Sequence, residues 1–231
     1  MTTRAVFFDV DFTLIYPGPM FQAEGYRAFC ARHGMAVDES KFEAGVASAA
    51  TILDRPDDAS YDPEVYIAYT AHIIEQMGAS GAAVDACARE IYREWAACQH
   101  FGLYDDVPQA LRRLADAGIR VGLISNSHRC LVSFQSHFEL QGLISATVSS
   151  SEHGFMKPHP SIFSAALQLV DVTAADAVMV GDNLKQDVEG ALRAGMRAIL
   201  LQRGDTATFA RADVPVIRSL VELPGAIERL G

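Results

Sequence analysis

The chain has 231 residues, of which half are hydrophobic, and it carries a formal net charge of −10. This composition argues against a disordered chain, and the absence of any basic run argues against a nucleic-acid partner. No apolar run approaches the roughly 18 residues needed to cross a bilayer, and the N-terminus lacks a secretory signal pattern. Of the cysteines, Cys30, Cys87, Cys98 and Cys130, none forms a CxxC pair and three lie at helical spacings. We therefore expect buried free thiols and a cytoplasmic protein.

The first predicted element is a strand of four apolar residues, Ala5-Val6-Phe7-Phe8, which ends abruptly in Asp9-Val10-Asp11. Its length and its acidic end are typical of a buried strand with carboxylates at its carboxyl end. The segment Tyr16-Pro17-Gly18-Pro19 then breaks the chain.

From about residue 20 to residue 99 the apolar residues recur with the period of a helix. Three stripes carry the pattern: Phe42, Val46, Ala49, Ala50 and Leu53; Val65, Tyr69, His72, Ile73 and Gln76; Val84, Cys87, Ala88, Ile91 and Trp95. Such stripes are far more often the core of a helical domain than a cofactor site. We therefore predict that this block is an all-helical insertion.

After residue 102 the pattern changes to alternating helices and strands. A helix face runs from Val107 to Leu114, with Asp106 as its expected N-cap and Gly118 as its stop. The other predicted elements are strands at 120–124, 177–180 and 198–201 and helices at 162–170 and 184–194. Alternation of this kind predicts an α/β fold, with a parallel sheet that includes the first strand and is covered by helices on both faces.

Polar residues follow the predicted strands or occupy loops that reach the same edge of the sheet, where ligands bind in such folds. They form four clusters: Asp9, Asp11 and Thr13; Ser125 and Asn126; Lys157 and Pro158; Asp182 and Asp187. Two bare carboxylates about 4 Å apart repel by roughly 4 kcal/mol at an effective dielectric constant near 20. A hard dication relieves this repulsion, and Mg²⁺ suits a few carboxylates together with a substrate phosphate. Lysine, serine and asparagine add donors for phosphoryl oxygens.

Each cluster also has a purely structural interpretation. Carboxylates after a strand often form turns, and Ser125, Asn126, Asp182 and Asn183 precede helices that they could cap. Lys157 and its proline could belong to an ordinary surface loop. The four clusters in this order, at successive strand ends, favour the functional interpretation over the structural one.

The ordered motifs resemble those of the haloacid dehalogenase-like (HAD) hydrolase superfamily over nearly the whole chain. The resemblance rests on Asp9-Val10-Asp11-Phe12-Thr13-Leu14, Ser125-Asn126, Lys157-Pro158 and Gly181-Asp182-Asn183-Leu184-Lys185-Gln186-Asp187. It implies a Rossmann-like core formed by residues 1–15 and 102–231, and a helical cap domain formed by residues 16–101. It also implies a magnesium-dependent phosphatase that acts on a small phosphorylated metabolite through an aspartyl-phosphate.

The resemblance assigns a role to each motif residue. Asp9 is the expected nucleophile and Asp11 the expected general acid and base. Ser125 and Lys157 are the expected phosphate ligands, and Lys157 is also counted among the catalytic residues. Thr13 and Asn126 are further candidates for binding the phosphate. Mg²⁺ is expected on Asp9, the backbone carbonyl of Asp11, and Asp182. Asp187 is expected to support the metal or to orient Lys157.

One position departs from the family pattern, because Phe12 stands where glycine is usual. The bulky side chain puts the geometry of that turn in question, while both carboxylates and Thr13 remain. His128 and Arg129 follow the second motif and could face a substrate, but we expect them on the surface at the start of a helix.

Three other functions share parts of this pattern. A 2-haloacid dehalogenase needs the nucleophile but no metal, and Asp11 argues against that branch. A phosphomutase shares the motifs and differs mainly in cap residues that exclude water. A phospho-acceptor signalling domain would carry its aspartate after a mid-chain strand and would lack the helical insertion. The natural substrate and the oligomeric state are not readable from the residues.

Overall fold

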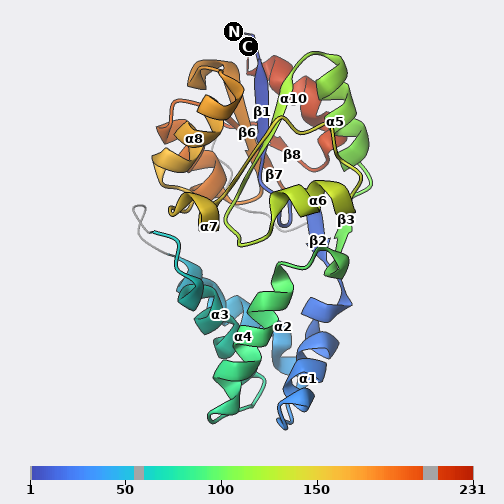
Figure 1. The fold of residues 1–231 in the computed structure, drawn as a ribbon, viewed down its shortest axis with the longest axis vertical. Helices are drawn as coiled ribbons and strands as arrows, with labels where there is room; N and C mark the ends of the chain where they lie inside the picture. The colour runs from blue at the N-terminus through green and yellow to red at the C-terminus, as the bar shows by residue number, and fades with distance from the viewer. Residues whose placement is uncertain (1, 55–59, 205–212, 231) are drawn as a thin grey trace. The chain divides into compact units, whose positions relative to one another are not determined.

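The structure is a computed structural model that describes residues 2–54, 60–204 and 213–230. These residues separate into two compact units. One unit contains the described residues of 1–16 and 103–231 together with Ser60, and the other contains those of 17–56 and 61–102. Figure 1 labels most of the helices and strands of both.

The first unit is built on a six-stranded sheet in the order β5-β4-β1-β6-β7-β8. The strands are β1 (Ala5–Phe8), β4 (Arg120–Ser125), β5 (Ala146–Ser149), β6 (Ala177–Gly181), β7 (Arg197–Leu201) and β8 (Val216–Ile217). All neighbouring pairs are parallel, and Val6 of β1 lies opposite Val121 on one side and Val178 on the other. The short apolar run at the N-terminus is therefore the central strand, which explains why all four of its residues are buried.

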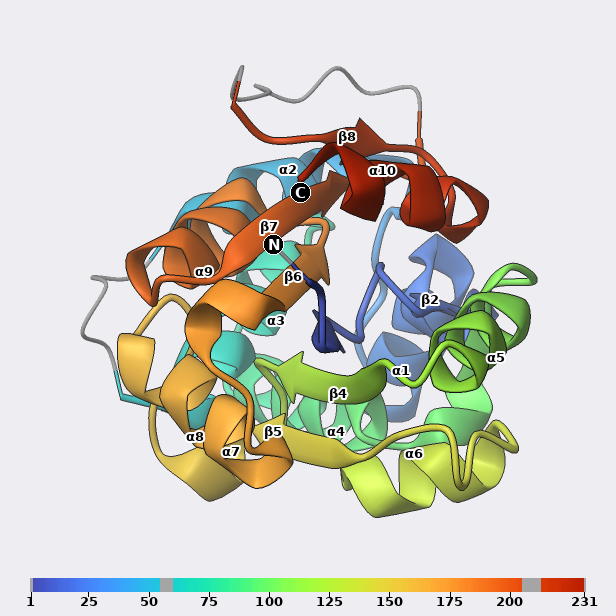
Figure 2. The same cartoon turned by 90° about the horizontal axis from the view of Figure 1, so that it is seen from above.

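Helices cover both faces of this sheet (Figure 2). They are α5 (Val107–Asp116), α6 (Leu131–His137), α7 (Ser150–His153), α8 (Pro160–Val170), α9 (Gly190–Arg193) and α10 (Leu223–Arg229). On one face, Phe163 and Ala166 of α8 pack with Phe7 of β1 in a single apolar cluster. The predicted α/β fold with a parallel sheet is thereby confirmed.

Several local predictions differ from the structure. Asp106 occupies the N-cap position of α5, but its side chain makes no capping hydrogen bond there. In the predicted helix at 162–170, now α8, the apolar side chain of Leu169 lies outside the buried face and is 61% exposed. The predicted helix at 184–194 begins as a π-helical turn, Leu184–Glu189, and becomes α-helical at Gly190. In that turn the Asn183 side chain is the cap, accepting from the backbone N–H of Gln186.

The second unit is helical, as its periodicity predicts. It contains α1 (Ala23–Arg32), α2 (Phe42–Ala49), α3 (Pro63–Gln76) and α4 (Ala83–Trp95). On α4 the predicted stripe is buried at Val84, Cys87, Ala88 and Ile91. On α3 the buried face is Ile67, Thr70, Ile73 and Ile74, so the predicted stripe through Gln76 was displaced around the helix.

Two short strands, β2 (Ile15–Pro17) and β3 (Phe101–Leu103), pair with each other where the chain leaves and re-enters the first unit. Cys30, Cys87 and Cys98 are buried and free, as expected, whereas Cys130 is exposed. Among the described residues, none of the helices combines the length and the hydropathy needed to span a bilayer.

Close packing at the centre of the sheet generates a stability prediction. A Cβ atom at Gly122 of β4 would lie 2.4 Å from Cδ1 of the buried Phe7 ring. We expect Gly122→Ala to lower the free energy of unfolding by about 1–3 kcal/mol through overpacking. The matched control is Gly225→Ala on α10, where the nearest atom would be Arg229 Nη1 at 3.8 Å. That control should gain up to about 1 kcal/mol from its helix propensity. Urea unfolding measures both, and equal effects would contradict the packing argument.

Candidate active site

The candidate site lies at the carboxyl edge of the sheet in the first unit. Asp9 directly follows β1, Ser125 is the last residue of β4, and Asp182 directly follows β6. Because these strands are parallel neighbours, their carboxyl ends meet at one edge. Lys157 reaches the same edge from the loop between α7 and α8.

The Lys157 ammonium joins two of the carboxylates. Its Nζ donates to Asp9 Oδ1 and to Asp187 Oδ1, each at 2.6 Å. The side chains of Lys157 and Asp187 are 1% exposed, and that of Asp9 is 11% exposed. A buried ammonium is costly unless it is paired and hydrogen-bonded, and both conditions are met here.

Neighbouring groups fix Lys157 and Asp187 in place. Asn126 Oδ1 accepts from the backbone N–H of Lys157 at 2.7 Å, and its Nδ2 donates to the Lys157 carbonyl at 2.9 Å. Asp187 Oδ2 accepts from the backbone N–H of Asn183 at 3.0 Å. A Cβ at Gly181 would lie 2.3 Å from Asp187 Cγ, so glycine at the end of β6 admits this carboxylate.

Asp9, Asp182 and Asp187 form a carboxylate cluster, in which one oxygen from each lies within 4.8 Å of the others. Thr13 Oγ1 donates to Asp182 Oδ1 at 3.2 Å. When all three are ionised, the carboxylates and the Lys157 ammonium together carry a net charge of −2 at this edge. A donor set of carboxylate oxygens carrying this charge fits one hard divalent cation.

The protonation of these groups reflects their burial and their crowding. Burial, followed by the charges of Asp187 and Asp182, raises the pKa of Asp9 well above its usual range, against the lowering effect of Lys157. Burial and then the Asp187 charge raise the pKa of Asp182 to about 7. Burial works to lower the pKa of Lys157, but the carboxylates of Asp187 and Asp9 outweigh it and raise that pKa. A bound cation would favour the ionised carboxylates, which are otherwise costly here.

Asp11 lies apart from the carboxylate cluster. Its Oδ1 accepts from Arg129 Nη1 at 2.9 Å, and the Arg129 side chain is completely buried while that of Asp11 is 17% exposed. The expectation that Arg129 lies on the surface at a helix start was therefore wrong. In sequence, nothing distinguishes this arginine from an exposed one.

The remaining predicted phosphate ligands are buried or hydrogen-bonded within the protein. Ser125 is 1% exposed, and its Oγ donates to Ser127 Oγ at 2.9 Å. Thr13 is buried, with its hydroxyl directed to Asp182. The Asn126 amide holds the Lys157 backbone, and it also donates to Gln186 Oε1 at 3.1 Å. A role in binding phosphate therefore stays a prediction for these three residues.

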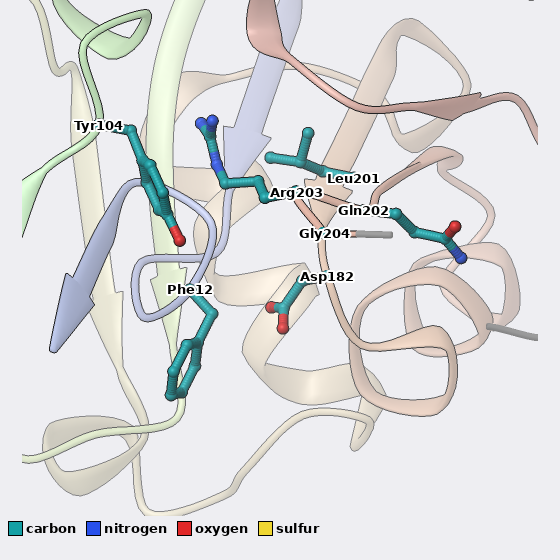
Figure 3. Close-up of a pocket in the computed structure, with 7 residues that line it drawn as sticks. All are labelled: Phe12, Tyr104, Asp182, Leu201, Gln202, Arg203 and Gly204. Atoms are coloured by element: carbon teal, nitrogen blue, oxygen red, sulfur yellow. The ribbon is translucent and has the colours of Figure 1, made fainter. Parts of the chain in front are cut away.

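A pocket of about 460 Å³ opens beside Asp182 (Figure 3). It is lined by Phe12, Tyr104, Asp182, Leu201, Gln202, Arg203 and Gly204. Phe12 has φ 63°, the left-handed conformation that glycine usually supplies, and its ring is 47% exposed. The turn therefore keeps a glycine-like backbone while its side chain becomes a wall of the pocket.

Arg203 braces this pocket in a way that the sequence did not suggest. Its Nη1 and Nη2 donate to the Asp106 carboxylate at 3.1 and 2.9 Å, and its Nε donates to the Thr13 carbonyl at 2.9 Å. The guanidinium also lies 3.8 Å from the centre of the Tyr104 ring. The carboxylate of Asp106 also accepts from Ser219 Oγ at 2.7 Å and from the backbone N–H of Leu220 at 2.8 Å, so its oxygens are engaged by these groups and by Arg203 rather than by the N-terminus of α5.

Comparisons with known proteins bear on this site. A family model described as haloacid dehalogenase-like hydrolase matches residues 3–195. An N-acylneuraminate-9-phosphatase of Homo sapiens is 30% identical, over 98% of this chain and 94% of its own length. A glyceraldehyde 3-phosphate phosphatase of Pyrococcus abyssi is 33% identical over 45% of each chain. A magnesium-bound HAD-hydrolase structure from Bacillus subtilis has a TM-score of 0.76 at 17% identity, over 97% of this chain and 98% of that chain, which shows the shared fold.

The pairing of Lys157 generates a second stability prediction. Lys157→Met would leave the carboxylates of Asp9 and Asp187 buried without their cation, and removing one partner of a buried pair costs about 3–5 kcal/mol. The double variant Lys157→Met/Asp187→Asn should recover part of that loss. Lys41→Met is the control, because its exposed ion pair with Asp38 is worth at most about 1 kcal/mol. Denaturant unfolding without added metal measures all three, and equal losses at the two lysines would refute this account.

Proposed function

The chain belongs to the haloacid dehalogenase-like hydrolases, and on that basis we propose that it is a Mg²⁺-dependent phosphatase acting through a phosphoryl group on Asp9. The observation that carries the proposal is the environment of Asp9. Its carboxylate lies at the end of the central strand, 2.6 Å from a buried ammonium and beside two further carboxylates. A nucleophile, a phosphate-binding cation and a metal-binding donor set therefore occupy one strand edge.

The first chemical step forms a bond between an Asp9 oxygen and phosphorus while the bond from phosphorus to the leaving oxygen breaks. Asp11 gives its proton to that leaving oxygen, so the alcohol departs neutral. In the second step Asp11 takes a proton from water, whose oxygen attacks the phosphorus of the aspartyl-phosphate. The bond to Asp9 then breaks, which releases phosphate and restores both aspartates. Two easier steps replace one hard displacement.

The ammonium of Lys157 stabilises the charge that gathers on the phosphoryl oxygens during transfer. It also holds Asp9 in one orientation, because Asp9 Oδ1 accepts its hydrogen bond. Asp187 keeps the ammonium from moving away as the reaction proceeds. Asn126 does the same through the backbone of Lys157.

Mg²⁺ would be held by Asp9, by Asp182 and, as the family resemblance implies, by the backbone carbonyl of Asp11. When bound, it supplies a Lewis acid for the phosphoryl oxygens. The grouping of the three carboxylates supports this assignment. The magnesium in the Bacillus subtilis relative supports it as well.

The three alternative functions, a signalling domain, a dehalogenase and a phosphomutase, fit the chain to different degrees. Membership of the hydrolase family sets aside the phospho-acceptor signalling domain. Asp11 still argues against a dehalogenase, which has no leaving oxygen to protonate. A phosphomutase shares the strand-edge residues, but both of the curated relatives described above are phosphatases.

The helical unit, which is inserted between β2 and β3, is proposed to act as the cap that selects the substrate. The names of the two relatives point to phosphate esters of small carbohydrates as the first compounds to test. We rank an N-acylneuraminate 9-phosphate first among the compounds to test, because the relative named for that substrate matches nearly the whole chain. Small leaving groups of this kind contain the hydroxyl and carboxylate groups that a cap can recognise.

The proposal predicts metal-dependent phosphate release. The purified chain is assayed with N-acylneuraminate 9-phosphate, glyceraldehyde 3-phosphate and p-nitrophenyl phosphate, with Mg²⁺ or with EDTA. We expect release with Mg²⁺, loss in EDTA and recovery when Mg²⁺ is restored. Asp182→Asn should raise the Mg²⁺ concentration that gives half-maximal activity, because it removes a charged ligand.

The matched control is Asp176→Asn, which changes an aspartate at the other end of β6, where its carboxylate accepts from Thr173 Oγ1. That variant should keep the Mg²⁺ response of the native protein. Full activity in EDTA would contradict the metal-dependent mechanism. Conversion of a sugar phosphate into its isomer without phosphate release would identify a mutase.

A further inference from the structure

The side chain of Arg129 occupies an unusual environment for an arginine. The residue lies in the loop between β4 and α6, four positions after Ser125, and its side chain is 0% exposed. Removing a guanidinium from water costs several kcal/mol, which an ion pair offsets only when its geometry is good. The Nη1–Oδ1 hydrogen bond of 2.9 Å to Asp11 offsets part of that cost.

Stability alone does not account for this pair. Buried ion pairs contribute about as much as apolar side chains of similar volume, or less, so a buried arginine is not needed to hold the loop in place. The pair does keep the carboxylate of Asp11 apart from the other three acidic side chains at this edge. Asp9, Asp182 and Asp187 form the carboxylate cluster, whereas the carboxylate of Asp11 is bound to Arg129 and is not among them.

We propose that Arg129 is a positioning residue that fixes the Asp11 carboxylate for proton transfer. The inference rests on the proposed function, in which Asp11 protonates the leaving oxygen and later deprotonates water. Arg129 anchors Oδ1, which leaves Oδ2 as the oxygen that exchanges the proton in both steps. The same contact keeps this carboxylate from joining the donor set for the cation.

Arginine suits this task for a geometric reason. Its guanidinium is planar and presents its donors in fixed directions, so the hydrogen bond from Nη1 holds Oδ1 of Asp11 at a defined place. Lysine offers a flexible point charge and would restrict the carboxylate much less. Misplacing a reacting group by about 1 Å can slow a reaction by about 10²-fold.

A double-mutant cycle tests the proposal on the full chain. The variants are Arg129→Met, Asp11→Asn and the two combined, each assayed with an alkyl phosphate and with p-nitrophenyl phosphate. We expect Arg129→Met to lower kcat for the alkyl ester by about 10²-fold, to slow formation of the aspartyl-phosphate less with the nitrophenyl ester than with the alkyl ester, and to change KM by only a few-fold. In the Asp11→Asn background the same substitution should change kcat by less than about 3-fold, because the positioned group is absent.

Two further readouts separate positioning from folding. The fraction of protein carrying phosphate in the steady state with p-nitrophenyl phosphate should rise in Arg129→Met, because water activation is slowed while the good leaving group still departs. Arg129→Lys preserves the buried charge, and it should keep the native melting temperature while losing most of the kcat. If Arg129→Met does not fold, Arg129→Lys replaces it in the double-mutant cycle with Asp11→Asn.

The proposal is overturned if the Arg129 substitutions slow turnover equally in the native and Asp11→Asn backgrounds, since the two residues would then act independently. Equal slowing of aspartyl-phosphate formation with both esters, or no loss of activity at all, would overturn it too. Failure of the proposed function is distinguishable from these outcomes, because the native protein would then release no phosphate from any ester.

Discussion

The buried ammonium of Lys157 has to be balanced by carboxylates, and this requirement determines much of the surrounding structure. Asp9 and Asp187 supply the balance at 2.6 Å each. Asp187 can approach only because Gly181 has no side chain at the end of β6, and the lysine backbone is held by the Asn126 amide. Residues from three separate strand ends are therefore committed to one cation. The two carboxylates outnumber it, and Asp182 adds a third, which gives a donor set that fits a divalent ion.

The topology of the sheet allows four acidic residues to share one edge without sharing one role. β1 is central, with β4 and β6 on its two sides, so the segments that follow both neighbouring strands lie beside the carboxyl end of β1, where Asp9 is placed. Through the loop that follows β4, Arg129 binds Asp11, whereas the residues that follow β6 surround Asp9. In the proposed mechanism, nucleophilic attack and proton transfer thus depend on carboxylates with different partners. The loop between α7 and α8 supplies the Lys157 ammonium to Asp9, whereas the loop after β4 supplies the Arg129 guanidinium to Asp11.

The elements of the fold could be predicted where local pattern decides them. The apolar run of β1 followed by Asp9 indicated a buried strand with a functional end, and the structure has that strand at its centre. Contacts between distant residues leave no local pattern: Arg129 and Asp11 are 118 positions apart, and Arg203 and Asp106 are 97 apart. The burial of Arg129 and the diversion of Asp106 from capping were consequently missed. The face of α3 was misplaced because its apolar residues fit more than one stripe.

The most direct test of the account is to locate the phosphoryl group on the protein. The native chain is quenched in acid during turnover with an alkyl phosphate and Mg²⁺, and then reduced with borohydride, which converts an aspartyl-phosphate into homoserine. Fragmentation of the tryptic peptide that follows Arg4 distinguishes position 9 from position 11. We predict homoserine at Asp9 and unmodified Asp11. Homoserine at Asp11, or an unmodified peptide from an enzyme shown to accumulate its intermediate, would contradict the assignment of Asp9 as the nucleophile.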